Sequence, residues 1–392
     1  MALFSPVRKI DVLGLLTIAA YGSWFYGFGV LAGDISRDLG VGLGSLGVVF
    51  GLTTLAGGCG AIGVGRLLDR RGPDVILRVI GPFGALLYIA LPFVRSALLF
   101  CSLHVVCGGL ISASAFYSFT QPIAMRVRPD EPMRAVTRLT IWGALASPIA
   151  IPLTEAARRT LTWRGAMRVS GIVLVCAFVM SAWALRGHIR TPRRSQAGLR
   201  DVIRSITTSA FLRSYAASGF FASMSVAALL VFQVPVMKWA GLSATAAASF
   251  AGARGLLQLI GRLPLLFFVT RFGAWRVQQM CKFAVILGAV ALWLAGSTIF
   301  ASVYVVIVGA SAGALSALDG MVGHEVLPAE NFATTIALLG FVATLGSALG
   351  PILAGCVVQL LSLSAVPIFV AATAIGAVAC QSVAYRLKRV AP

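Results

Sequence analysis

The chain has 392 residues, of which 59% are hydrophobic and 11% are charged, and its mean hydropathy is +0.93. Soluble globular proteins carry charge on roughly a quarter of their residues, so this composition excludes a water-soluble protein. Apolar runs such as residues 171–183 are almost continuous, whereas the strands of a transmembrane β-barrel alternate apolar and polar residues. The sequence therefore predicts an all-α membrane protein.

The net charge is +20, from 32 basic and 12 acidic residues. In a soluble protein such an excess would indicate a nucleic-acid partner. Here the basic residues form short clusters between apolar runs, as they do beside cytoplasmic helix ends, so we expect a lipid bilayer and no nucleic acid. The seven cysteines contain no CxxC pair, which indicates neither a disulfide framework nor a zinc site. No metal and no cofactor is expected.

Taken in chain order, the apolar runs predict twelve transmembrane helices of about 20 residues each. They cover residues 12–32, 45–64, 75–94, 98–123, 139–153, 166–185, 215–237, 244–269, 277–294, 299–321, 335–358 and 365–385. The fifth is short as drawn and should continue past Glu155. We expect an N-terminal six-helix bundle (1–185), a basic cytoplasmic loop (186–213) and a C-terminal six-helix bundle (214–392).

The distribution of arginine predicts the topology. The central loop is rich in arginine, and if it is cytoplasmic, so are most of the other basic clusters and both termini. We expect a monomer in the inner (cytoplasmic) membrane of a bacterium. Gly60 and the loop that follows the second span have a counterpart at Gly261 after the eighth span, which indicates two pseudo-symmetric halves in parallel duplication.

The loop after the second span, residues 65–72, reads GRLLDRRG. It resembles the Gly-x-Leu-x-Asp-Arg-x-Gly motif of the major facilitator superfamily. Residues 163–165 (WRG) resemble that family's start of the sixth span, and residues 346–351 (GSALGP) resemble its Gly-x3-Gly-Pro signature. The resemblance covers nearly the whole chain. It implies a twelve-helix secondary transporter that works by alternating access and is not an enzyme.

We interpret Gly65, Asp69, Arg70 and Gly72 as a conformational gate. Asp69 and the adjacent arginines can bridge helix ends in an exposed loop, and a charge contact that exists in only one conformation biases an alternating-access equilibrium. The two glycines permit a tight turn. The alternative is that Asp69 only caps a helix.

Ionisable residues at membrane depth are functional candidates. Arg254, Gln258 and Arg262 in the eighth span fall within about 80° of one helix face, and the two arginines lie about 12 Å apart along the axis. The pattern at 258–262 resembles the span-eight arginine segment of monocarboxylate and oxalate carriers, in which the arginine matching Arg262 faces a substrate carboxylate. The alternative for Arg262 is a structural ion pair with Asp319.

Four further residues complete the predicted site. Tyr21 and Tyr117 are assigned to the substrate cavity because the first and fourth spans line it in family members. Asp319 and His104 are assigned to coupling with protons, and for His104 a packing role is the alternative. Glu155, by contrast, is expected to pair locally with Arg158 and Arg159, three and four residues later on its helix.

The preferred hypothesis is a secondary active transporter that moves a small organic anion, a mono- or dicarboxylate, together with protons. Two alternatives stay open: a multidrug or metabolite effluxer in antiport with protons that Asp34 or Asp319 would carry, and an uptake carrier for a siderophore. A membrane-embedded enzyme is not expected, since the sequence contains no Ser/His/Asp set, metal cluster or nucleotide loop.

Overall fold

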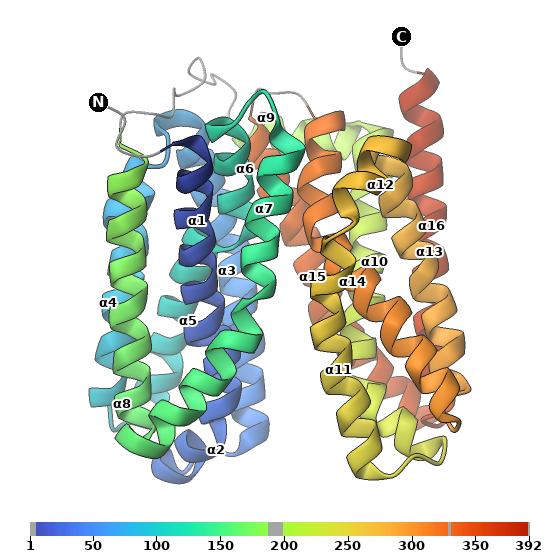
Figure 1. Ribbon diagram of the computed structural model, residues 1–392, viewed down its shortest axis with the longest axis horizontal. Coiled ribbons are helices and arrows are strands. Elements are labelled where there is room, and N and C mark those ends of the chain that lie inside the picture. The colour runs from blue at the N-terminus through green and yellow to red at the C-terminus, as the bar shows by residue number, and fades with distance from the viewer. Residues whose placement is uncertain (1–4, 187–198, 328–330, 391–392) are drawn as a thin grey trace. The chain divides into compact units, whose positions relative to one another are not determined.

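The structure, a computed structural model, describes residues 5–186, 199–327 and 331–390 (Figure 1). These residues are helical almost throughout and include no β-strand. Cα packing groups the chain into two units. Unit 1 comprises Met1–Gln196 and Leu327–Leu338, and unit 2 comprises Ala197–Val326 and Leu339–Pro392.

Unit 1 begins with a first span made of three consecutive segments, in which a π-helical stretch joins two α-helices. A short 3-10 segment ends the third span, and the extended backbone of Phe116 separates the two helices of the fourth. The elements are α1 (Pro6–Ala20), η1 (Tyr21–Tyr26), α2 (Gly27–Leu39), α3 (Leu43–Arg71), η2 (Ile76–Ile80), α4 (Gly81–Ala90), η3 (Leu91–Phe93), α5 (Ala97–Ala115), α6 (Tyr117–Val127), α7 (Pro132–Ala144) and α8 (Ala146–Ala184).

Unit 2 begins with a short amphipathic helix in the predicted central loop, of which residues 187–198 lie outside the described part of the chain. Five long helices and one bent helix pair follow it. The elements are α9 (Leu199–Thr208), α10 (Ala210–Trp239), α11 (Ala244–Arg262), α12 (Leu265–Phe272), α13 (Ala274–Trp293), α14 (Thr298–Val326), α15 (Phe332–Leu360) and α16 (Ala365–Val390). The first turns of α15 group with unit 1.

The predicted twelve-helix architecture is confirmed. Nine stretches among the described residues are long and apolar enough to cross a membrane, and α11 with α12, bent by 50°, makes a tenth. Thr162 has φ 63° and ψ 170°, so α8 is two helices joined by a turn, which divides the stretch Pro132–Ala184 into two spans. The twelfth is α13, which has 20 residues and carries Arg276 and Lys282, and which is not among the strongly apolar stretches. The fifth span continues past Glu155, as predicted.

Glycines let helices touch at the backbone in both units. In α15 a Cβ at Gly346 or Gly350 would collide with the carbonyl of Phe220 or Met224 on α10. The Gly-x3-Gly run therefore packs α15 against α10, which is the usual role of such runs in membrane helices.

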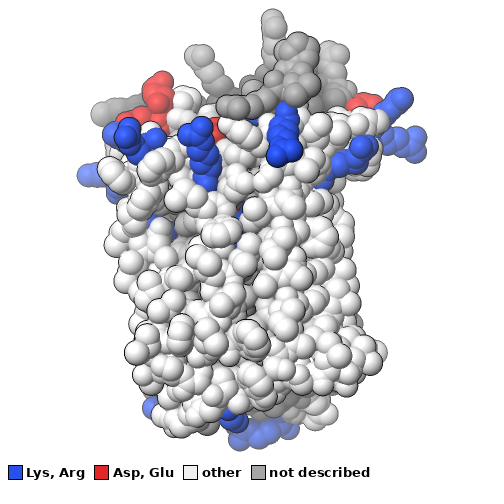
Figure 2. Space-filling model, turned by 90° about the vertical axis from the view of Figure 1, so that its right-hand side faces the viewer, with Lys and Arg blue, Asp and Glu red and all other residues white. Residues whose placement is uncertain are grey.

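On the face shown in Figure 2, Lys and Arg gather at the two ends and leave a broad uncharged belt between them. The protein is an integral membrane protein.

Candidate functional site

Asp69 caps the first turn of α15. Its Oδ2 accepts hydrogen bonds from the backbone N–H and the hydroxyl of Thr334, both at 2.8 Å, and its Oδ1 accepts from the N–H of Ala333 at 3.3 Å. Arg126 of α6 binds the same Oδ1 at 2.6 Å and the carbonyl of Leu68 at 3.1 Å. A carboxylate at a helix N-terminus satisfies orphan N–H groups and complements the helix dipole, so the charge of Asp69 orders the start of α15.

Two expectations about the gate are wrong. Asp69 does not lie in an exposed loop, because α3 extends to Arg71 and the residue is 3% exposed. Gly65 does not form a turn, since it lies inside α3, where a Cβ would come within 2.6 Å of the carbonyl oxygen of Ala333. Its missing side chain lets α15 approach. Gly72 does end α3, with φ 77°, and Arg70 is exposed in the last turn.

In unit 2, Arg262 at the end of α11 is only 4% exposed. Its Nε donates to the carbonyl of Gly313 at 2.9 Å, and its Nη2 donates to Oγ of Ser316 at 2.8 Å. Both acceptors lie on α14 and are neutral. The helices approach closely here because Gly313 has no Cβ that would collide with the carbonyl of Gln258. The guanidinium is therefore held in a fixed orientation at the α11–α14 contact.

Arg254, two turns earlier on α11 and 6% exposed, belongs to a second polar cluster. Its Nε donates to Oε1 of Gln233 on α10, and the hydroxyl of Tyr304 on α14 donates to the same oxygen, each at 3.0 Å. Gln258 lies between the two arginines and is half-buried. Tyr304 was not predicted, because a single tyrosine in an apolar span carries no periodic signal.

Asp319 of α14 has a different partner from the one expected. Its Oδ1 accepts a hydrogen bond from Nε2 of Gln278 on α13 at 2.8 Å, whereas Arg262 binds Gly313 and Ser316. Gln278 is itself held by Gln381 of α16, whose Nε2 donates to Oε1 of Gln278 at 3.0 Å. Gln278 and Gln381 are buried, while Asp319 is exposed. The carboxylate of Asp319 therefore has a fixed partner on α13.

Lys282, one turn beyond Gln278 on α13, is a buried charged residue outside the predicted site. It donates to Oγ of Ser218 on α10 at 2.9 Å and interacts electrostatically with Asp319. The signal was present, since a lysine within the predicted span 277–294 is rare enough to be a functional candidate.

The remaining predicted residues lie in unit 1. Tyr21 stacks on Phe116 with ring centroids 3.8 Å apart, and its ring lies 5.5 Å from that of Tyr117. The structure thus brings the two tyrosines together. His104 of α5 is fully buried among aromatic rings, the nearest being Phe28 at 4.5 Å. This is the environment of a packed side chain.

The acidic residues of the first and fifth spans form ion pairs. The predicted local pairing of Glu155 is confirmed, since its oxygens lie 2.7 Å from Nε of Arg158 and 2.7 Å from Nε of Arg159. Asp34 contacts Arg37 and lies 2.9 Å from Nη1 of Arg158. The carboxylate of Asp34, a candidate proton carrier in the efflux alternative, is thus paired with two arginines.

Comparison with known proteins gives a family and a fold. The model of the Major Facilitator Superfamily matches residues 12–351, while no curated protein matches. Three solved structures are similar. The fucose:proton symporter FucP of E. coli has a TM-score of 0.74 and 12% identity, over 97% of this chain and 99% of that chain. A bacterial homologue of the iron transporter ferroportin in an outward-facing state has a TM-score of 0.74 and 14% identity, over 98% of this chain and 100% of that chain, and the human organic anion transporter MFSD10 has a TM-score of 0.76 and 13% identity, over 96% and 100%. At these identities the likeness shows the fold alone, and none of the three points to the monocarboxylate or oxalate branch.

Proposed function

The chain belongs to the major facilitator superfamily and is a membrane transporter, and from this premise we propose that it carries a small organic anion, a mono- or dicarboxylate, by alternating access. One observation carries the proposal, namely the excess of positive charge inside unit 2. Three cations, Arg254, Arg262 and Lys282, are buried there. From residue 210 to residue 392 the sequence contains three acids, Asp319, Glu325 and Glu330, the last of which lies outside the described residues.

Glu325 is already engaged at a helix end, where its Oε1 accepts a hydrogen bond from the N–H of Ala274 at 3.2 Å. Among the described residues of this unit, buried cations therefore outnumber the remaining carboxylate, that of Asp319. Positive charge at membrane depth is costly, and an anionic substrate reduces that cost when it binds. Arginine suits this role because its guanidinium offers a carboxylate two parallel hydrogen bonds. Of the solved structures with this fold, MFSD10 is an organic anion transporter, which agrees with the proposal.

We assign the conformational gate of the transporter to the contact of Asp69 with the start of α15. A charged cap that forms in one conformation and breaks in another stabilises the first relative to the second, and so sets the populations between which the transporter alternates. Gly65 supports this role, because it lets the start of α15 lie directly against α3.

Substrate binding is the direct test. Purified protein is titrated with radiolabelled oxalate, lactate and pyruvate, and in parallel with a cationic dye. We expect saturable binding of at least one carboxylate and none of the dye. Dye binding without carboxylate binding would contradict the proposal and favour the multidrug effluxer.

For coupling to protons we propose Asp319. It contacts Gln278 and interacts electrostatically with Lys282. Protonation would remove the negative charge that Lys282 interacts with, and would thereby increase the affinity of unit 2 for an anion. Proton and anion would then bind together, which is the requirement for symport.

The variant Asp319→Asn should lose the response of uptake to an imposed pH gradient while retaining substrate exchange. Asparagine keeps an oxygen that accepts the hydrogen bond from Gln278, so the contact with α13 survives and only the titrating charge is lost. Uptake and exchange are measured in proteoliposomes. Glu325→Gln is the matched control, because Glu325 also lies on α14 but caps α13, and it should respond to the gradient as the wild type does. A gradient response that persists in Asp319→Asn would exclude Asp319 as the coupling residue.

For the topology we propose that both termini and the central loop face the cytoplasm of a bacterium. Single cysteines are placed at Gln196, which lies outside the described residues, and at Gly241 in the turn after α10, in a background without the seven native cysteines. An impermeant thiol reagent added to intact cells should label position 241. Preferential labelling of position 196 would reverse the orientation.

A further inference from the structure

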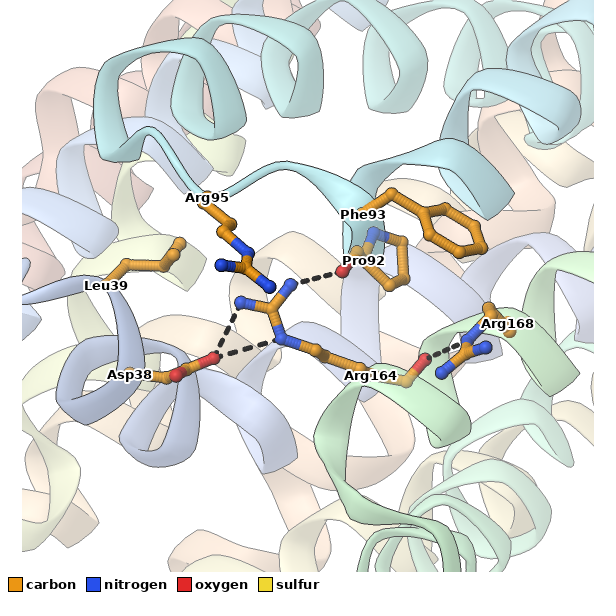
Figure 3. A pocket seen from close by; sticks show the side chains of 7 residues that line it. All are labelled: Asp38, Leu39, Pro92, Phe93, Arg95, Arg164 and Arg168. Carbon is orange, nitrogen blue, oxygen red and sulfur yellow. Dashed lines mark hydrogen bonds and ion pairs between the residues drawn. The ribbon is translucent and has the colours of Figure 1, made fainter.

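A cavity of about 520 Å³ lies at the end of unit 1 where α2, η3 and the second half of α8 meet (Figure 3). It is apart from every residue discussed above as a substrate, coupling or gate residue. Three of its lining side chains are guanidiniums and one is a carboxylate, so its net charge is +2 (three minus one). The lining residues are Asp38, Leu39, Pro92, Phe93, Arg95, Arg164 and Arg168.

Arg164 is fixed in place by its surroundings. Its Nε and Nη2 both donate to Oδ2 of Asp38, at 3.1 and 2.8 Å, and its Nη1 donates to the carbonyl of Pro92. The guanidinium also lies 4.4 Å from the ring of Trp163, whose Nε1 donates to the same Asp38 oxygen at 3.0 Å. The negative charge of Asp38 is thus used in holding Arg164 and Trp163.

Arg168 and Arg95 supply the remaining positive charge. Arg168 donates from Nε to the carbonyl of Arg164 at 3.3 Å and lies 5.3 Å from the ring of Phe93. Arg95 lies in the connection between η3 and α5, and its guanidinium points toward that of Arg164 (Figure 3). Two guanidiniums that face each other repel unless an anion lies between them, so this arrangement favours an anionic ligand.

The surface next to the cavity is apolar and open. Phe93 is 68% exposed. From it an exposed apolar stripe runs along α4, and a second one runs along α8 from the turn after Arg168; the two helices pack against each other. The exposed residues are Val79 on η2, Phe83 and Leu86 on α4, and Val169, Ile172, Val173, Val179 and Trp183 on α8. An arginine cluster at the end of such stripes matches a molecule with an anionic head and apolar tails.

We infer that this cavity, which we call the arginine cavity, binds the phosphate of an anionic phospholipid whose acyl chains lie along the α4–α8 stripes. Arg95 and Arg168 donate hydrogen bonds to the phosphodiester oxygens, and Arg164 with Asp38 forms the rigid floor of the site. Basic pockets between membrane helices bind anionic headgroups on the cytoplasmic side of membranes, and the arginine cavity offers the same chemistry at the end of unit 1 that the proposed topology places outside. The inference is independent of the transported substrate.

The test compares lipids by native mass spectrometry of the full-length, detergent-purified protein. We expect the wild type to bind phosphatidylglycerol more tightly than phosphatidylcholine. The double variant Arg95→Gln/Arg168→Gln should lose that preference. One basic residue near an anionic lipid contributes about 1 kcal/mol, so the affinity for phosphatidylglycerol should fall roughly thirtyfold. The affinity for phosphatidylcholine should fall less, because its choline cation offsets the charge of the phosphate. Arg164 is left intact because its removal would also release Asp38 and Trp163.

The matched control is Arg78→Gln/Arg159→Gln, which removes the same charge from two arginines that pair locally with Asp74 and Glu155. It should keep the preference. If the double variant does not fold, the single variant Arg95→Gln is tested instead, because Arg95 lies outside any helix. It should weaken phosphatidylglycerol binding about fivefold. Unchanged lipid preference in the variants would overturn the inference. So would a rise of the wild-type thermal midpoint with inorganic phosphate that equals the rise with phosphatidylglycerol, since the site would then hold a soluble anion.

Discussion

Arg262→Lys is expected to weaken the binding of the carboxylate substrate roughly ten- to hundredfold, although the charge is kept. The guanidinium uses Nε and Nη2 to bind Gly313 and Ser316 on α14 and presents its planar fork in a fixed orientation. A lysine offers a single ammonium on a flexible stem. A charge-assisted hydrogen bond contributes about 1.5–3 kcal/mol, and the loss of one such bond sets the size of the effect. The measurement is equilibrium binding of radiolabelled carboxylate to purified variants.

Arg254→Lys is the comparison variant, and a smaller loss is expected because the contact of Arg254 with Gln233 needs only one donor. Ser316→Ala separates packing from binding, since it removes an acceptor of Arg262 and leaves the cation in place. Thermal midpoints are measured for all variants. Normal carboxylate binding by Arg262→Ala would end the organic-anion proposal. Unfolding of Arg262→Ala, with binding unchanged in Arg262→Lys, would instead assign the arginine to the α11–α14 contact.

Asp69→Asn is expected to reduce the transport rate roughly two- to thirtyfold while substrate affinity stays near that of the wild type. Both carboxylate oxygens of Asp69 accept hydrogen bonds, whereas an asparagine amide has one accepting oxygen and one NH2 group that donates. At least one of the hydrogen bonds from α15 is therefore lost, together with the ion pair to Arg126. Loss of a helix cap costs about 0.5–2 kcal/mol, which is enough to shift a conformational equilibrium by up to roughly thirtyfold. Uptake into proteoliposomes and equilibrium binding are measured in parallel.

Asp74→Asn is the matched control, because Asp74 follows the same stretch of sequence but pairs with Arg78 at an exposed site. It should transport as the wild type does. Thr334→Val removes one hydroxyl donor to Asp69 and should give an intermediate rate. Wild-type transport by Asp69→Asn would show that the cap stabilises α15 without acting as a gate, which is the alternative reading of this residue.

The helical class and the number of spans can be predicted from hydropathy alone, because a bilayer requires about 20 apolar residues for each crossing. The sequence also predicts contacts within one helix. The pairing of Glu155 with Arg158 and Arg159 follows from the helical period alone, and the structure confirms it. The match of residues 12–351 to the family confirms the resemblance first seen in the loop motif.

Contacts between residues far apart in the chain could not be predicted in this way. Thr334 binds Asp69 across 265 positions, Arg164 binds Asp38 across 126, and Asp319 accepts from Gln278 rather than from the expected Arg262. Gly65 likewise acquires its role from Ala333, a residue of another helix. The physical reason is that hydropathy fixes the length of a span but not its rotation or its neighbours. Those depend on close packing between helices, which small residues and buried polar groups determine.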